Sequence, residues 1–314
     1  MPGARFLLPL LVCGVLSASS AAVARSPKAV LRDETTKLNA VTYTLPAGWT
    51  GAGQVVWNPE AELSANVCVR TMQLTHPGRE LLAHYISSFE TPIRSLTTDA
   101  DTLSRLLEPA VQRLPGYELL SPGSGEARLV PAREEVRAYH LGRDRIRREL
   151  GQDTRGDVYL LCTSYDATHT HPVTGEKTPC RIVCGAVVHE RSTREDGKKQ
   201  VTASFHDIFI LGAPDDAPKD ATPQDAPITT ALSDLRRTMA EPRFNSRWLQ
   251  THIHIMAQAL DGMPRVDARV LPLLEEKAEN GIRMGLPAVL DAMEEQYGAG
   301  QTSEKPGSAD KPLR

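Results

Sequence analysis

Aromatic residues are scarce in this 314-residue chain and make up 5% of it. A stacking platform for sugars or nucleic-acid bases needs several exposed rings, so the low aromatic content argues against both ligands. A net charge of −3 gives no excess of positive charge for nucleic acid either. With 40% hydrophobic and 24% charged residues, the composition is that of an ordinary soluble globular protein.

The motifs of the common enzyme classes are missing as well. The sequence has no Gly-x-Ser-x-Gly, no phosphate-binding glycine loop, no His-Glu-x-x-His and no Cys-x-x-Cys. These absences argue against a serine hydrolase with a nucleophile elbow, a P-loop enzyme, a zinc peptidase of the helical type and a thioredoxin-like oxidoreductase. We therefore expect binding rather than catalysis, and the sequence indicates no cofactor.

Long apolar runs are absent except at the beginning of the chain. Arg5 precedes an apolar run from Phe6 to Leu16, and small residues follow up to Ala24. This pattern predicts a signal peptide over residues 1–24. No later run approaches the ~20 apolar residues of a membrane-spanning helix. We expect an exported protein, periplasmic or extracellular, with no transmembrane segment after removal of the signal.

Few cysteines remain after the signal peptide, namely Cys68, Cys162, Cys180 and Cys184. Four cysteines allow three pairings, and an oxidising compartment favours disulfides. The strand register described below favours a disulfide between Cys162 and Cys184. Pairing of Cys180 with Cys184 is disfavoured because a short piece of strand would have to fold back on itself. Whether Cys68 and Cys180 pair stays open, as does the alternative of free, buried thiols.

Three consecutive strands are predicted over Asp157–Asp166, Arg181–Arg191 and Gln200–Leu211, which are rich in Val, Ile, Tyr, Phe and Thr. Asp196-Gly197 is typical of a tight hairpin turn. A turn centred there places Val188 opposite Phe205 and Cys184 opposite Phe209.

The longer first loop, Ala167–Pro179, gives a second estimate of the register. If it is symmetric about Val173, Cys162 falls opposite Cys184, and both turns agree on one apolar face. That face holds Val158, Leu160, Cys162, Ile182, Cys184, Ala186, Val188, Phe205 and Phe209. Asp207 also falls on this face, and the pattern does not explain it.

The opposite face carries a row of polar side chains. Asp157 is predicted opposite His189, and His189 opposite Ser204, which is the spatial order of a hydrolase relay. Asp157, His189 and Ser204 are therefore catalytic candidates. A flat strand face supplies no oxyanion hole, however, so we expect no catalysis from them. His206 lies diagonally from His189 on the same face and fits equally well in a polar network.

A metal site is the other hypothesis for the histidines. His169 and His171 are two residues apart in extended chain, so both side chains point the same way and form a candidate chelating pair. No third ligand is evident, and histidines in loops are usually solvated.

Helices are predicted around this sheet. Helices are predicted over residues 77–89, 102–114, 131–150, 228–239, 243–260, 266–279 and 286–297, and apolar residues stand at helical spacing in those at 77–89, 102–114 and 243–260. The helix at 131–150 is rich in arginine, which favours a solvated face over an anion or headgroup site.

The run from Tyr43 to Trp49, with its Pro-Ala-Gly-Trp turn, is followed by Gly53, Val55 and Trp57. This stretch resembles the opening of secreted domains of the PsbP/Mog1-like type. The resemblance covers about one tenth of the chain, and residues 91–155 depart from it. It implies an antiparallel sheet packed between helices and a role in binding or assembly, and no functional residue is carried over.

The sequence thus predicts an α+β fold, an antiparallel sheet with flanking helices in an α/β/α sandwich-like arrangement, plus a C-terminal helical extension. The expected divisions are a sheet domain at 25–262, the extension at 263–297 and a disordered tail at 298–314. The expected function is that of an exported, non-catalytic binding or assembly protein of the cell envelope, whose partner is an unidentified protein or envelope component. The alternative is a hydrolase or metal-dependent enzyme that uses His189 or the pair His169 and His171.

Overall fold

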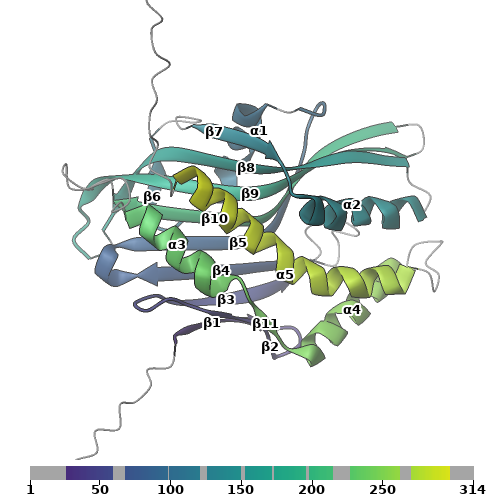
Figure 1. Cartoon of the computed structure of the whole chain (residues 1–314), viewed down its shortest axis with the longest axis horizontal. Coiled ribbons are helices and arrows are strands. Elements are labelled where there is room, and N and C mark those ends of the chain that lie inside the picture. Colours follow the sequence, from purple (N-terminus) through teal and green to yellow (C-terminus); the bar gives the residue numbers. More distant parts are fainter. Residues whose placement is uncertain are drawn as a thin grey trace, which may run out of the picture.

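One large mixed sheet dominates the computed structural model (Figure 1). The structure describes residues 26–58, 68–97, 99–120, 126–149, 153–171, 173–195, 198–214, 227–261 and 270–297. The predicted signal peptide and the predicted tail at 298–314 lie outside these residues. Within the described residues, ten strands run in the order β11-β2-β1-β3-β4-β5-β10-β9-β8-β6, and an eleventh, β7, pairs with β8 beside this path.

The strands are β1 (Lys28–Asp33), β2 (Leu38–Thr44), β3 (Thr50–Trp57), β4 (Cys68–His76), β5 (Leu81–Pro92), β6 (Tyr117–Leu119), β7 (Ala127–Pro131), β8 (Asp153–Thr170), β9 (Lys177–Glu195), β10 (Lys198–Pro214) and β11 (Arg243–Phe244). The helices are α1 (Ala100–Val111), α2 (Glu134–Glu149), α3 (Pro227–Met239), α4 (Ser246–Asp261) and α5 (Val270–Tyr297). A short 3₁₀ turn, Pro77–Arg79, precedes β5.

The predicted sandwich-like fold class is wrong. The sheet is mixed, because β1 pairs with β3 in parallel while the other pairs are antiparallel, and helices are few relative to strands. Pairing of β5 with β10 joins the N-terminal strands and the long strands β8, β9 and β10 into one sheet. At about 4.8 Å between neighbouring strands, such a sheet is roughly 45 Å wide, and the five helices of the described residues cannot cover both of its faces.

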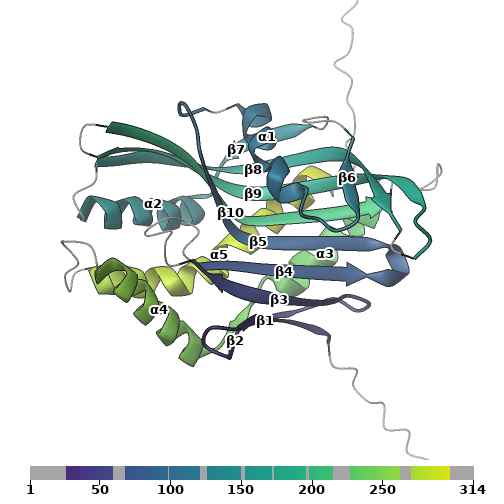
Figure 2. The same ribbon diagram turned by 180° about the vertical axis from the view of Figure 1, so that it is seen from behind.

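The two faces of the sheet are covered unequally. Helices α2, α3, α4 and α5 lie on one face, which we call the helix face (Figure 1). The view from behind shows α1 on the other face, which we call the α1 face (Figure 2). Val158, Leu160 and Val187 point to the helix face, whereas Leu161 and Ala186 point to the α1 face. None of the described helices is long and apolar enough to cross a membrane.

Strand β5 replaces the helix predicted after Pro77. It lies between β4 and β10, and most of its residues are buried. A central strand that is buried on both faces loses the alternation of polar and apolar residues, so its apolar run cannot be told from a buried helix by periodicity. The spacing of Leu81, Tyr85 and Phe89 fits a helix, but the segment forms strand β5, so the predicted helix is wrong.

The helices after residue 100 agree better with the prediction. Those at 102–114 and 131–150 are confirmed as α1 and α2. The two predicted helices at the C-terminal end form a single helix, α5, whose Val289 and Met293 are buried against the sheet. Gly185 allows this close approach, because a Cβ there would lie 2.6 Å from Cγ of Met293.

The β9–β10 register is confirmed near the turn and wrong farther away. Val188 pairs with Phe205 as predicted, but Cys184 pairs with Ile210 instead of Phe209. The register changes between His206 and Phe209, where Asp207 adopts a left-handed φ of 50°. An extra residue at such a bulge shifts the pairing of everything beyond it.

The predicted disulfide between Cys162 and Cys184 is also wrong. Cys162 pairs with Gly185, one residue from the prediction, because the loop between β8 and β9 is centred between Val173 and Thr174. Since side chains alternate along a strand, this slip places Cys162 on the helix face and Cys184 on the α1 face. Both are buried free thiols.

Candidate metal centre

Helix α2 carries polar side chains on its buried stripe. Val136, His140 and Asp144 follow one another at intervals of four residues, so they lie on one side of the helix. All three are buried, with His140 1% and Asp144 2% exposed. A histidine and an aspartate thus occupy positions that an ordinary amphipathic helix fills with apolar residues.

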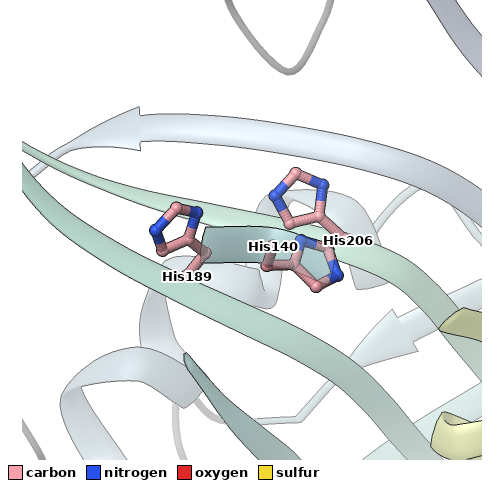
Figure 3. Close-up of side chains that lie close together, drawn as sticks. All are labelled: His140, His189 and His206. Carbon is pink, nitrogen blue, oxygen red and sulfur yellow. The ribbon is translucent and has the colours of Figure 1, made fainter. Parts of the chain in front are cut away.

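Strands β9 and β10 supply two more histidines under this helix. His189 pairs with Ser204, and His206 pairs with Val187, so both histidines are on the helix face as the sequence predicted. His189 is fully buried and His206 is 5% exposed. Figure 3 shows the rings of His140, His189 and His206 gathered between the helix and the two strands.

The three rings are close enough to share one ion. One nitrogen from each of His140, His189 and His206 lies within 4.8 Å of the other two. The His140 ring centroid is 4.5 Å from that of His206 and 6.2 Å from that of His189. Zinc–nitrogen bonds of about 2.0–2.1 Å require nitrogens roughly 3.4 Å apart in a tetrahedral site, so shifts of less than about 1 Å per ring close the site.

Asp144 orients the ring of His189. Its Oδ2 lies 3.2 Å from Nε2 of His189, and both side chains are almost fully buried. A proton on Nε2 that is donated to Asp144 leaves Nδ1 as an acceptor. Carboxylates hold metal-binding histidines in this way, because the hydrogen bond fixes both the tautomer and the ring orientation.

Gly156 of β8 makes room beside His189. A Cβ at this position would lie 2.4 Å from the carbonyl oxygen of Glu190 and 3.0 Å from Nε2 of His189. The strand can therefore pass this close to the imidazole only where it carries no side chain.

The predicted row of Asp157, His189 and Ser204 is not formed. His189 does pair with Ser204, but Asp157 pairs with Glu190, so its side chain leaves the strand on the side opposite to His189. Arg137 donates to Asp157 through Nε at 3.1 Å. The one-residue slip that separates the cysteines also removes the acid from the proposed relay.

Asp157 instead lines a pocket of about 360 Å³ together with Leu96, Thr97, Arg155, Gly156, Tyr159 and Glu190. The backbone N–H of Thr97 donates to Oε1 of Glu190 at 2.9 Å. Burial raises the pKa of Glu190, and this hydrogen bond opposes the rise. The acidic side chains in the pocket are thus already bonded within the chain.

His169 and His171, the predicted metal pair, have other contacts. The His169 ring packs on Tyr117 with centroids 4.6 Å apart, and burial lowers the pKa of His169. Nδ1 of His171 accepts the backbone N–H groups of Val173 and Thr174. In the described part of the chain, the group of three or more side chains able to hold a metal is the one formed by His140, His189 and His206.

Sequence reasoning found two of these three histidines and missed His140. His140 belongs to a helix whose many arginines drew attention to its solvated side. The signal that identifies it is the spacing of Val136, His140 and Asp144, which places two polar residues on the inward stripe.

Comparison with known proteins found no matching family model, no matching curated protein and no matching solved structure. The PsbP/Mog1-like resemblance of the N-terminal stretch is therefore neither supported nor contradicted by a relative.

Proposed function

We propose that this chain is an exported metal-binding protein in which His140, His189 and His206 coordinate one divalent transition-metal ion. The observation that carries the proposal is the convergence of three buried imidazoles, from one helix and two strands, within 4.8 Å. Close, desolvated histidines repel one another when protonated. A metal ion is the ligand that uses their lone pairs together.

The chemistry of the ligands favours Zn²⁺. Neutral imidazole suits zinc, copper and nickel, whereas calcium and magnesium prefer oxygen ligands. A carboxylate bonded to a ligating histidine, as Asp144 is to His189, is a common feature of zinc sites.

The burial of the site favours metal binding over turnover of a large substrate. Three protein ligands leave the fourth coordination position of a tetrahedral zinc free, and the histidines are at most 5% exposed, so only small ligands fit there. Export and binding of an envelope partner stay predictions. The apolar surface of the helices after Ala226 prompted the idea of a partner, and described apolar residues of these helices, such as Leu235, Trp248 and Val289, belong to the core under the helix face.

The test uses tag-free protein lacking residues 1–24, stripped of metal with a chelator and then titrated with Zn²⁺. We expect one zinc per chain by calorimetry and elemental analysis. At free zinc 100-fold above the dissociation constant, stabilisation of about 2.7 kcal/mol should raise the melting temperature by about 5–10 °C.

The variants His140→Gln and His206→Gln should each lose this shift, because each removes one ligand while keeping a side chain of similar size. The double variant His169→Gln/His171→Gln is the matched control and should keep it. Loss of zinc binding in the control alone, or no stoichiometric zinc in the unmodified protein, would refute the proposed centre.

A further inference from the structure

Two buried hydrogen-bond donors lie on the same sheet face as the histidines. Ser204 is fully buried, and its Oγ has no hydrogen-bond partner among the described residues. Arg191 is 2% exposed and bonds Glu90 through Nη2, while Nη1 has no partner among the described residues. Neither side chain is among the three candidate metal ligands.

Both donors flank His189. Ser204 lies directly across from it, at a Cα separation of about 4.5–5.5 Å for paired residues. Arg191 is two residues farther along β9 and therefore points to the same face, about 6–7 Å away. Glu90, the partner of Arg191, pairs with Ser204 from the other side. Serine and arginine thus frame the edge of the histidine cluster.

Leaving these donors unsatisfied is costly. A buried hydroxyl or guanidinium N–H without an acceptor loses its hydration with nothing in return. The acceptor that both groups can share is an oxygen-rich ligand between them.

The net charge of the zinc centre also indicates an anionic ligand. Zn²⁺ with three neutral imidazoles and the carboxylate of Asp144 carries a net charge of about +1, since the Arg191–Glu90 pair cancels. An excess charge in a buried site is unfavourable unless a counter-ion accompanies it. A bound monoanion balances the centre.

We propose that the zinc centre takes a small oxyanion, of the size of bicarbonate or phosphate, as its fourth ligand. One oxygen binds the metal, and the others accept hydrogen bonds from Oγ of Ser204 and Nη1 of Arg191. This inference rests on the proposed metal site and names what completes it. The burial of every group involved restricts the anion to a few heavy atoms.

The test uses Co²⁺ in place of Zn²⁺, because the visible absorption of tetrahedral Co²⁺ changes when its fourth ligand changes. The Co²⁺-loaded protein is titrated with bicarbonate, with inorganic phosphate and, as a control, with chloride. We expect a saturable spectral change with bicarbonate or phosphate that chloride does not reproduce, and the tighter of the two identifies the anion.

Variants assign the donors. Ser204→Ala should weaken the anion about 3–10-fold and Arg191→Lys about 10–100-fold, because a hydrogen bond from a charged donor is the stronger one. Measured in buffer without bicarbonate or phosphate, neither variant should change zinc affinity more than about 3-fold, since neither residue is a ligand. Ser104→Ala, at a buried serine on the α1 face that bonds Thr163, is the matched control and should leave the anion affinity unchanged.

The outcomes separate the two proposals. Zinc binding without any anion-dependent spectral change overturns the oxyanion site and leaves the metal site intact. Absence of metal binding overturns both. If Arg191→Lys does not fold, the Ser204→Ala variant alone tests the proposed donors. An unchanged anion affinity in Ser204→Ala would then refute the proposed anion site.

Discussion

The buried carboxylate of Asp33 and the polar side chains around the three histidines differ in how many of their hydrogen-bonding atoms have a partner among the described residues. Around Asp33, Oδ2 accepts the indole N–H of Trp57 at 3.0 Å and that of Trp248 at 2.7 Å. Its Oδ1 accepts the backbone N–H groups of Thr35 and Thr36. Around the histidines, Ser204 and Arg191 keep donors that no described residue accepts. Both oxygens of the Asp33 carboxylate are thus used within the chain, whereas the Ser204 and Arg191 donors are not, which is why we infer a ligand beside the histidines.

The pKa of Asp33 reflects this closure. Burial alone would raise the pKa, but the hydrogen bonds from Trp57, Thr36 and Trp248 outweigh it and lower the pKa. The carboxylate therefore stays charged inside the protein and ties β1 to β3 and α4.

His252 shows that a partly buried histidine is not a ligand by default. Its ring stacks on Trp248 with centroids 5.1 Å apart and lies 5.2 Å from Trp57. Burial lowers the pKa of His252 to about 4, so the ring is neutral at physiological pH. The neighbours of His252 are the rings of Trp57 and Trp248, which offer no metal ligand, whereas those of His140 are two other imidazoles.

The largest effect is expected for Asp33→Ala in metal-free protein. The buried indole N–H of Trp248 and the partly buried one of Trp57 lose their acceptor, and the turn after Asp33 loses its cap. The free energy of unfolding should therefore fall by about 3–5 kcal/mol in urea denaturation. Ser204→Ala removes a buried hydroxyl without a partner, so the free energy of unfolding should stay the same or rise, by up to about 1–3 kcal/mol.

Glu34→Ala, at the exposed neighbour that pairs with Arg32 and Lys37, is the control and should cost less than about 1 kcal/mol. If Asp33→Ala and Ser204→Ala lowered the free energy of unfolding by the same amount, the proposed difference between the two clusters would be wrong.

A smaller, pH-dependent effect is expected at Asp207, a buried carboxyl with fewer donors than Asp33. Tyr85 donates to its Oδ1 at 2.7 Å. Burial raises the pKa of Asp207 from 3.8 to about 6, although Arg70 and the Tyr85 hydrogen bond oppose the rise. The folded protein therefore favours the protonated form of Asp207. The contribution of this carboxyl to the free energy of unfolding is fully present below pH 3.8 and is lost as the pH rises through about 6.

Asp207→Asn lacks this titration. The free energy of unfolding of the unmodified protein, minus that of the variant, should fall by about 2–3 kcal/mol between pH 4 and pH 7. A flat difference for Asp207→Asn would show that this carboxyl titrates normally.

The smallest effect is expected from reducing agents. Burial raises the pKa of Cys162 to about 12 and that of Cys184 further, so both thiols are unreactive in the folded protein. A reductant should shift the melting temperature by less than about 1 °C, because no disulfide joins them. Mass spectrometry after alkylation in denaturant without reduction should find both cysteines modified, and a linked peptide would contradict the register.

Local chemistry in the sequence was sufficient for several elements. The Asp196-Gly197 signal predicted the hairpin of β9 and β10, and Glu195 does pair with Lys198. Because a short turn fixes the register beside it, Val188 opposite Phe205 and His189 opposite Ser204 were both correct. Amphipathic spacing gave α1 for the same reason, since that pattern is contained within one element.

The tertiary structure decided which side chains meet. The face on which Cys162 or Asp157 lies depends on a single residue in a longer loop, and the bulge at Asp207 resets the register again. His140 joins His189 and His206 only because α2 packs over β9 and β10, far from it in sequence. The sequence by itself determined that the histidines of the hairpin share a face, because that follows from the period of a strand. Packing between distant elements decided that a third histidine completes them, and periodicity within one element carries no information about that packing.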